Sequence, residues 1–442
     1  MALALLLAAQ IAAAAPLDCQ TALGPLYEGT EEAALPGQVD GTTIRDARAL
    51  IALRRTQGDA LITVKGGNFS RADFRGARLH NICFLDTNLS GSDWRDAQAP
   101  GIGFIRANLG GANLADARLD RILLRNSDMT NVHGERAVLS NGRLDGGWFD
   151  GKLDNFRLDQ ADLTNFRFEC GITLDDGCPV YTADGEFSLR EANLRGANLF
   201  YWATIEGATI DRTEVPPDQL RALRTTRLAG PILIHGYQTN VEITPAEYRT
   251  LLPHLLDPER PRQEAPQRPA GPPDWARPGT TALFVNASLL FDDAFRETAL
   301  YRRLVPALIA ASDMHVIVTV RPDGGIDAEG EAVGANAHMC SLGGEGLRFD
   351  PATGYYSGPY EARPDDPPGW RGRQAPVLML YGERAEVYGG GRAFREDSEY
   401  PVGDYASCGA RAGFDTMVRV PASAAEIERL RGGAEGEPDG PS

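Results

Sequence analysis

The sequence predicts a mainly β protein, in which a long coil turns a corner every five residues, lies between helical caps and is followed by a small α+β or β-rich C-terminal domain. Three observations predict this fold. Large apolar residues recur at every fifth position over about a third of the chain. Helix-like patterns flank that region, and a proline-rich segment then separates it from a stretch of strand patterns that includes one helix pattern.

The composition excludes several classes of protein. With 43% hydrophobic and 24% charged residues among 442, the chain resembles a folded globular protein rather than a disordered chain or a coiled coil. Its formal net charge of −17 opposes binding to nucleic acid and to anionic membranes over most of the surface. The 49 Gly and 29 Pro, beside only 5 Trp, predict many short elements with small core side chains.

The N-terminal residues are typical of an export signal. Residues 2–15 are apolar and Ala-rich, and they run into Pro16 like a hydrophobic segment before a cleavage site. No basic residue follows Met1, which leaves a buried N-terminal helix as the alternative, and Asp18 before Cys19 does not fit a lipoprotein. We therefore assign 1–15 to a signal peptide and expect a periplasmic or secreted protein of a Gram-negative bacterium, without a membrane span after cleavage.

A five-residue period occupies residues 68–212. From Phe69 to Phe149, fifteen of the seventeen positions five apart are large and apolar, and the residue two before each is mostly small. Neither a helix nor a strand keeps every fifth residue on one face. A coil with four corners per turn does, with both positions inward and backbone hydrogen bonds between turns. The inward residues expected to form its core are Phe74, Leu79, Phe84, Leu89, Phe104, Leu109, Leu114, Leu119, Leu124, Leu194 and Leu199.

The phrases at 106–117 (RANLGGANLADA) and 190–199 (REANLRGANL) resemble the pentapeptide-repeat family, whose unit reads Ala-Asp/Asn-Leu-x-x. The resemblance covers about a third of the chain and implies a right-handed quadrilateral β-helix. The resemblance also implies DNA mimicry as an alternative function, because some members of the family are acidic rods that bind a topoisomerase. Residues 69–212 carry 16 Arg and Lys against 21 Asp and Glu, however, so most of the acidity lies outside the coil.

The ends of such a coil need caps, because they expose unpaired strand edges. Residues 16–67 are expected to form the N-terminal cap, with a helix at 44–57 and a strand at 61–64. Residues 213–256 are expected to form a helical C-cap, with helices from Pro217 to about Thr226 and from Pro245 to Leu256.

The remaining chain divides into a linker, a domain and a tail. Seven prolines predict a linker over 257–278. Residues 279–421 are expected to form the C-terminal domain, with a helix at about 292–311 and strands at 281–285, 315–320, 377–381 and 417–420. The glycine runs 343–346 and 389–391 are expected to be turns, and 422–442 a disordered tail.

Six cysteines, an even number, suit an oxidising compartment. Cys170 and Cys178 bracket a short Gly/Asp-rich loop and are a candidate local disulfide, while Cys340 and Cys408 are a second candidate pair. No C-x-x-C motif occurs, which argues against a structural zinc site.

Candidate catalytic and metal-binding groups all have a more ordinary interpretation. His338 and Cys340 have the chemistry of a base and a nucleophile, but an oxidised Cys340 is favoured. Asp323, Asp327, Glu329 and Glu331 offer four carboxylates for Ca²⁺, but their spacing does not match an EF-hand and a solvated hairpin turn is favoured. Asp175 and Asp176 are interpreted in the same way. We therefore assign no catalytic, cofactor-binding or metal-binding residue.

The sequence thus predicts an exported, non-enzymatic scaffold or binding module whose partner is another protein rather than nucleic acid. Its oligomeric state is left open. The alternatives are an acidic topoisomerase-binding DNA mimic and an enzyme with its site in 279–421.

Overall fold

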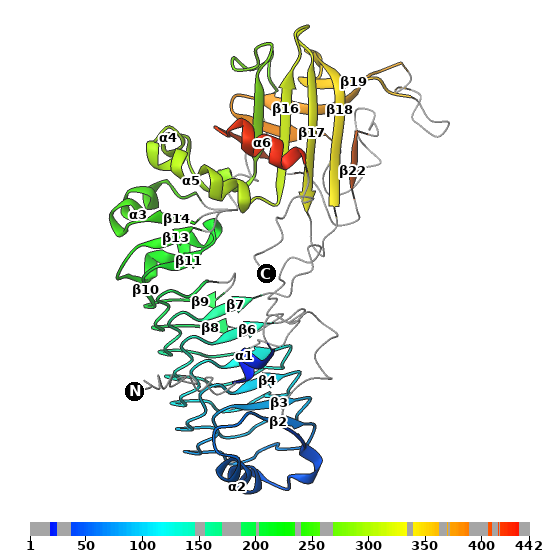
Figure 1. The fold of residues 1–442 in the computed structure, drawn as a ribbon. Helices are drawn as coiled ribbons and strands as arrows, with labels where there is room; N and C mark the ends of the chain where they lie inside the picture. The colour runs from blue at the N-terminus through cyan, green and yellow to red at the C-terminus, as the bar shows by residue number, and fades with distance from the viewer. Residues whose placement is uncertain are drawn as a thin grey trace, which may run out of the picture. The chain divides into compact units, whose positions relative to one another are not determined.

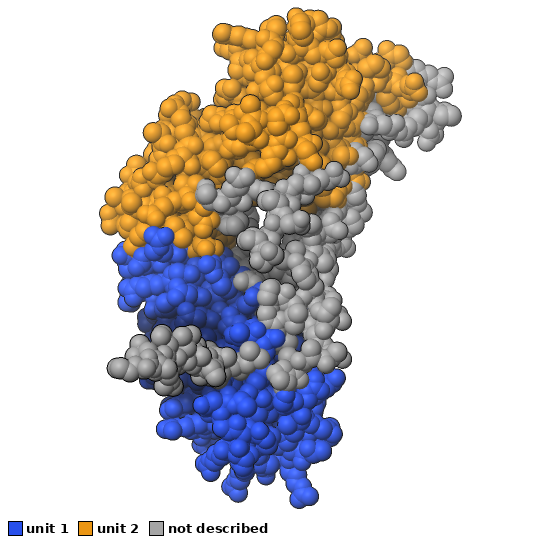
Figure 2. All heavy atoms as spheres, in the orientation of Figure 1, with its two compact units in different colours: residues 1–172, 178–213, 225–229 blue, residues 173–177, 214–224, 230–442 orange. Residues whose placement is uncertain are grey.

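The computed structural model describes residues 18–23, 37–145, 155–169, 187–199, 203–234, 240–256, 268–333, 339–361, 369, 372–388, 405–408, 414 and 416–432. The predicted signal peptide lies outside these residues. The chain forms two compact units (Figures 1 and 2). The first comprises residues 1–172, 178–213 and 225–229, and the second comprises 173–177, 214–224 and 230–442.

The first unit is a coil whose successive turns stack as parallel strands (Figure 1). One face carries seven strands in chain order: β1 (Gln38–Asp40), β2 (Ile62–Lys65), β3 (Ile82–Leu85), β4 (Gly103–Ile105), β5 (Leu123–Arg125), β6 (Arg143–Asp145) and β7 (Arg167–Glu169). Shorter parallel pairs continue the unit: β8 (Phe187–Ser188) with β9 (Ala203–Thr204), and β10 (Thr209–Ile210) with β12 (Arg227–Leu228).

Each complete turn of the coil spans four pentads. Asn68 pairs with Asn88 and Asn88 with Asn108, so partners are twenty residues apart, as four corners per turn require. The spacing lengthens from His133 to Arg157 because the intervening chain contains extra residues. The coil with four corners per turn, which the five-residue period predicts, is thus the architecture of this unit.

Small and large side chains fill the interior in alternating layers. Phe84 and Phe104 stack with ring centroids 5.5 Å apart, one turn above the other. Trp94 lies between turns and donates from Nε1 to Ser92 Oγ at 2.8 Å. Ser92 in turn donates to the Leu89 carbonyl, so the small polar residues of the interior have partners and carry no desolvation penalty.

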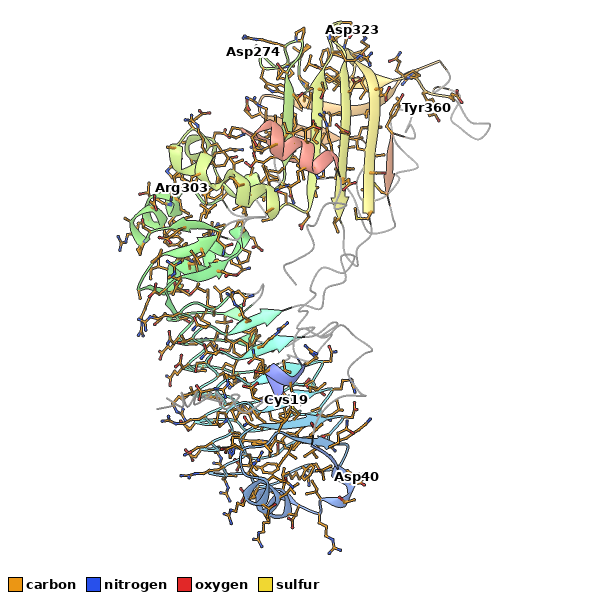
Figure 3. All side chains as sticks on the ribbon, in the orientation of Figure 1. Cys19, Asp40, Asp274, Arg303, Asp323 and Tyr360 are labelled. Carbon is orange, nitrogen blue, oxygen red and sulfur yellow. A yellow bond between two sulfur atoms is a disulfide. The ribbon has the colours of Figure 1, made fainter. Side chains whose placement is uncertain are left out.

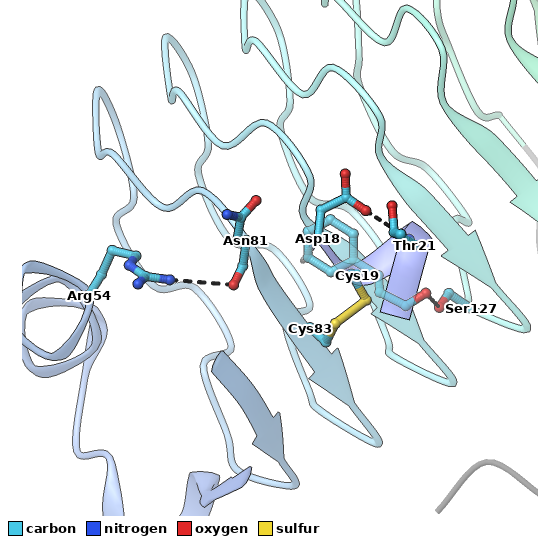
Figure 4. The surroundings of a disulfide bond; sticks show 8 residues. Asp18, Cys19, Thr21, Arg54, Asn81, Cys83 and Ser127 are labelled. Atoms are coloured by element: carbon cyan, nitrogen blue, oxygen red, sulfur yellow. Dashed lines mark hydrogen bonds between the residues drawn. A yellow bond between two sulfur atoms is a disulfide. The ribbon is translucent and has the colours of Figure 1, made fainter. Parts of the chain in front are cut away.

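The N-terminal end of the coil is closed by helix α2 (Ala47–Gln57). Asp46 caps α2 by accepting from the Ala49 N–H, and Gly58 ends the helix at φ 59°. Arg54 is 2% exposed, and its guanidinium donates to the carbonyls of Ala60 and His80 at 2.8 and 3.0 Å. It therefore satisfies backbone acceptors at the first turn of the coil, and Figure 4 shows a further, longer bond from Arg54 to the Asn81 carbonyl.

The second unit begins with a small mixed layer. Residues 213–256 were expected to be a helical cap, but they contain a three-stranded sheet of β11 (Thr213–Val215), β13 (Ile232–Ile234) and β14 (Val241–Ile243). The helices are a 3-10 helix at Pro217–Thr225, α3 (Pro245–Leu251) and a 3-10 turn at Leu252–His254. The short apolar run Ile232-Leu233-Ile234, directly after Pro231, carried the strand signal.

The C-terminal domain is an antiparallel sheet of eight strands that closes on itself. Its order is β17-β16-β15-β23-β21-β20-β19-β18, and β18 pairs again with β17. The bounds are β15 (Thr281–Val285), β16 (Met314–Val320), β17 (Ile326–Val333), β18 (Met339–Asp350), β19 (Tyr355–Gly358), β20 (Ala375–Tyr381), β21 (Arg384–Val387) and β23 (Met417–Val420). A ninth strand, β22 (Ala406–Cys408), pairs with β18. Of the two expectations for this domain, α+β or β-rich, the structure shows the β-rich one.

Several local expectations are wrong. The helix expected at 292–311 is two helices, α4 (Asp293–Arg296) and α5 (Ala299–Ala310), because extended Thr298 caps the second helix through its hydroxyl. Residues 343–346 are part of β18 rather than a turn, and Gly346 at φ 61° absorbs a register shift against β17. Part of the expected tail is helix α6 (Ala424–Arg431), which Ser423 and Glu426 cap reciprocally.

The proline-rich segment also differs from a linker where the structure describes it. Trp275 donates from Nε1 to the Gly382 carbonyl at 2.9 Å and packs on Phe284 of the closed sheet. Arg268 donates to the Thr353 carbonyl at 2.8 Å. Residues 268–278 are therefore bound to the C-terminal domain.

Candidate functional site

The core positions predicted from the repeat lie inside the coil. All eleven are buried, with exposures between 0 and 6%: Phe74, Leu79, Phe84, Leu89, Phe104, Leu109, Leu114, Leu119, Leu124, Leu194 and Leu199. All eleven side chains are apolar, so they bring no ionisable group into the interior. Any chemistry of this unit must therefore take place on its outer surface.

At many turns of the coil the residue before a core Leu or Phe is an Asn or Asp, and these residues have a structural task. Asn68, Asn88 and Asn108 each accept, through Oδ1, the backbone N–H two residues further on, at 2.9 to 3.1 Å. Asp73 and Asp93 do the same on the neighbouring face. These bonds fold the chain at each corner, so the carboxylates of the repeat shape the backbone and do not form a separate acidic binding surface.

A second corner position was missed in the sequence. Every fifth residue from Arg71 to Asn141 has a positive φ. Gly adopts this conformation readily, Asn and Asp adopt it less often, and other residues adopt it only rarely. Eleven of these fifteen residues are Gly, Asn or Asp. This enrichment was the available signal.

Two of the corner arginines, Arg106 and Arg136, make ion pairs along the coil. Arg106 donates from Nε to Asp86 at 2.8 Å, and Arg136 donates to Asp116 at 2.7 Å, each one turn away. Side-chain hydrogen bonds from Arg136 hold the pKa of Asp116 below its ordinary value. Exposed pairs of this kind contribute little stability individually, and they neutralise much of the charge on this surface.

The most distinctive surface lies on the strand face, under helix α1 (Cys19–Leu23). A disulfide joins Cys19 to Cys83 of β3 (Figure 4). The side chains beneath α1 point outward from the coil, yet they are apolar and buried. This cluster, the α1 patch, comprises Cys19, Leu61, Cys83, Leu85, Ile105 and Leu123, with Ala22 packed against it.

The backbone of the coil is shaped to receive α1. Gly103 stands in register between Cys83 and Leu123, and a Cβ placed on it would lie 2.1 Å from Cys19 Sγ. A Cβ on Gly101 would lie 2.6 Å from the Cβ of Asp18. The Cys19 N–H donates to the Gly101 carbonyl at 3.2 Å. Only glycine allows this close approach.

Asp18 fixes the start of α1 to the coil (Figure 4). It is 4% exposed, accepts from the Thr21 N–H at 2.7 Å and accepts from Arg121 Nε at 2.7 Å. Burial raises the pKa of Asp18, but the hydrogen bonds from Thr21 and Arg121 outweigh burial and leave the pKa below its ordinary value. The carboxylate is therefore ionised and bound at neutral pH.

Sequence analysis did not predict the α1 patch, although two signals for it were present. Leu85, Ile105 and Leu123 occupy outward positions of the five-residue pattern, where polar residues are the rule elsewhere in the coil. Cys19 and Cys83 were left without partners among six cysteines. An apolar outward face needs a cover, and Cys83 within that face marks where the cover is attached.

Cys340, which was considered as a nucleophile, is oxidised, as the sequence analysis favoured. Cys340 of β18 is joined to Cys408 of β22 by a disulfide, so no thiolate is available there (Figure 3 shows all described side chains). His338 lies outside the described residues, as do Cys170, Cys178, Asp175 and Asp176. The four cysteines that the structure describes all form disulfides.

Three of the four carboxylates of the hairpin are paired with three different arginines. Asp323 is bonded to Arg348, Asp327 to Arg321 at 3.0 Å, and Glu329 to Arg431 at 2.6 Å. Glu331 stands opposite His315 in the neighbouring strand. Within the described ranges, no group of three or more His, Cys, Asp or Glu side chains is placed to hold a metal ion.

A shallow hollow lies at one end of the closed sheet, beside Trp275. Pro272, Asp274, Arg277 and Glu383 contribute to its lining. Arg419 binds Glu383 through two hydrogen bonds and stacks over the Trp275 ring, 5.3 Å from its centroid. These contacts hold residues 268–278 on the sheet, so the groups around the hollow already serve packing.

No helix in the described parts of the chain is both long and apolar enough to cross a membrane.

Comparison with known proteins agrees with the coil. Residues 64–91 and 103–141 match the family model of the pentapeptide repeats, in eight copies. A search of curated proteins found no match. Solved structures similar to this chain include HetL, a pentapeptide repeat protein involved in heterocyst differentiation regulation from Nostoc sp. Strain PCC 7120, at 20% identity, covering 40% of this chain and 89% of that chain with a TM-score of 0.19. Another is QnrB1, a plasmid-mediated fluoroquinolone resistance protein, at 16% identity, covering 35% and 82% with a TM-score of 0.18.

Proposed function

We propose that this pentapeptide-repeat protein is a non-enzymatic scaffold that binds another protein through the outer faces of its coil. The proposal rests on the different roles of the inward, corner and outward side chains of the coil. Its interior is closed and apolar, its repeat carboxylates fold the corners, and what remains is a long surface of outward side chains in fixed register. Such a surface recognises partners by shape and charge, since repeat proteins use extended surfaces for binding.

The second unit supports the same class of function. Among the groups considered for catalysis or metal binding, Cys340 is in a disulfide, and Asp323, Asp327 and Glu329 are in ion pairs with arginines. A nucleophile needs an accessible thiolate or an activated hydroxyl beside a base.

Reconstitution with a purified partner tests the scaffold. The tagged mature protein should capture a partner from the native organism, and the purified pair should bind saturably. Exchange of exposed outward residues such as Arg118→Glu or Arg157→Glu should then weaken binding by at least about tenfold for residues in the contact, without lowering the melting temperature. Turnover of a substrate, or a purified pair that shows no saturable binding, would contradict the scaffold.

We also propose that the protein is exported. Support comes from the apolar segment at 2–15 and from the two disulfides, because disulfides persist in oxidising compartments. Fractionation followed by N-terminal sequencing tests this, and the expected product begins near Pro16 in the periplasm or medium. Full-length protein with reduced thiols in the cytosol would overturn export but would leave the scaffold intact.

A further inference from the structure

The N-terminal end of the coil is basic in a protein whose net charge is −17. Residues 37–80 carry eight Arg and Lys against four Asp, a local charge of +4, and seven of the eight cations are Arg. The segment comprises the cap α2 and the first turn of the coil. We name this surface the basic end.

All the cations of the basic end except Arg54 are exposed to solvent. Arg48 and Arg55 are exposed and lie seven residues apart, so two helical turns bring them to the same side of α2. The opposite side carries buried Leu50 and Arg54 and rests on the coil. Figure 3 shows nitrogen-tipped side chains projecting outward from this helix.

Five of these arginines make no ion pair with the residues that the structure describes. They are exposed Arg45, Arg48, Arg55, Arg71 and Arg78.

The four aspartates of the segment are engaged locally. Asp46 caps α2, Asp59 binds His80 at 2.9 Å, and Asp73 binds Arg75 at 2.7 Å. Asp40 accepts from the Thr42 N–H at 2.9 Å. The positive charge of the basic end is therefore not cancelled by adjacent carboxylates.

We infer that the basic end binds the surface of an anionic phospholipid membrane, without inserting into it. Its cations are spread over a helix and the closed end of a coil rather than lining a groove, an arrangement that meets an extended layer of phosphates better than a peptide. Guanidinium groups bind phosphate oxygens in pairs. The only large apolar side chains found exposed among the described residues are Val333 and Met339, in the second unit, so attachment here is electrostatic.

The acidic remainder of the coil does not prevent this contact. Turns are about 4.8 Å apart, and charges separated by more than roughly 8 Å are largely screened at physiological salt. Residues 81–106, the next part of the coil, add only three Asp and two Arg. The coil therefore meets the membrane by its end. The inference rests on the charge of this end and is independent of the scaffold's partner and of export.

Vesicle sedimentation with the full chain tests the inference. We expect binding to phosphatidylcholine vesicles that contain about 30% phosphatidylglycerol, none to pure phosphatidylcholine, and release of bound protein between roughly 50 and 300 mM NaCl. The double variant Arg48→Glu with Arg55→Glu should bind at least about twenty-five-fold more weakly, since each cation near such a surface contributes roughly fivefold.

The matched control changes the same charge elsewhere on the coil. Arg118→Glu with Arg157→Glu alters two exposed arginines of later turns and should bind within about twofold of the wild type, because these sites lie beyond a screening length. Unchanged melting temperatures establish that both variants fold. Failure of the wild type to bind anionic vesicles, equal loss in both double variants, or equal displacement by a short DNA duplex at the same phosphate concentration would each overturn the inference.

Discussion

Each position of the pentad has its own physical task. The centre residue fills the interior, as Leu114 does at 1% exposure, and the residue before it folds the corner through a side-chain hydrogen bond, as Asn113 does to the Ala115 N–H at 3.0 Å. The corner residue two after the centre adopts a positive φ, as Asp116 does at 61°. Substitutions should therefore differ sharply between positions only a few residues apart.

Leu114→Asp should destabilise the coil severely. The charge would enter a closed apolar interior without a partner, at a cost of about 4 kcal/mol or more. Arg118→Ala, four residues later and exposed, should change the free energy of unfolding by less than about 0.5 kcal/mol. Thermal unfolding of both variants measures this, and an equal loss would contradict the inward register.

Asp18→Asn should weaken the binding of α1 in a pH-dependent manner. The folded-state pKa of Asp18 lies below the ordinary value of 3.8, so its contribution is complete above that value and is lost as the pH falls through the folded-state pKa. We expect the variant to be less stable by about 1.5 kcal/mol at pH 7. The difference should vanish near the acid limit of folding.

Unfolding of both proteins by denaturant across the pH range checks this prediction. A stability difference between Asp18→Asn and the wild type that does not change between pH 7 and pH 3 would show that folding does not lower the pKa of Asp18.

Among the helices and strands, α1 depends most on contacts with residues that are far away in the sequence. It has five residues, too few to be stable alone, and it is held by the Cys19–Cys83 disulfide, by Asp18 and by the α1 patch. The chain between the two cysteines is long, with a sequence separation of 64. The disulfide therefore restricts the unfolded chain considerably.

Loss of this disulfide should release α1. The variant Cys19→Ser with Cys83→Ser should lose roughly 4 kcal/mol by the chain-entropy estimate, and amide exchange should become fast in residues 18–23. Binding of a hydrophobic dye should increase because Leu85, Ile105 and Leu123 become accessible. The variant Cys340→Ser with Cys408→Ser, which alters the second unit, should leave exchange in α1 unchanged. Persistent protection of α1 without its sulfur atoms would show that packing alone suffices.

At the scale of the whole molecule, the chain consists of two units with separate cores. The coil is stabilised by stacked turns and contacts between neighbours, whereas the closed sheet depends on strands that are far apart in sequence, such as β15 and β23. Units with separate cores can unfold independently.

Calorimetry should therefore show two unfolding transitions. Leu114→Asp should lower the temperature of only one, while Val318→Asp, which places a charge in the core of the closed sheet, should lower only the other. A single transition that both variants shift together would show that the units unfold as one.

The sequence by itself determined the coil, its inward residues and its cap at α2, because each turn repeats the same local pattern of large, small and corner residues. It also indicated β15, β16, β20 and β23 through local apolar runs. Only the tertiary structure decided which distant segments meet. The cover that Cys19 forms over outward Leu85 and Leu123, the pairing of β15 with β23 in the closed sheet, and the binding of Trp275 to that sheet are contacts between separated segments. No local period encodes such contacts, because they depend on where the folded chain returns in space.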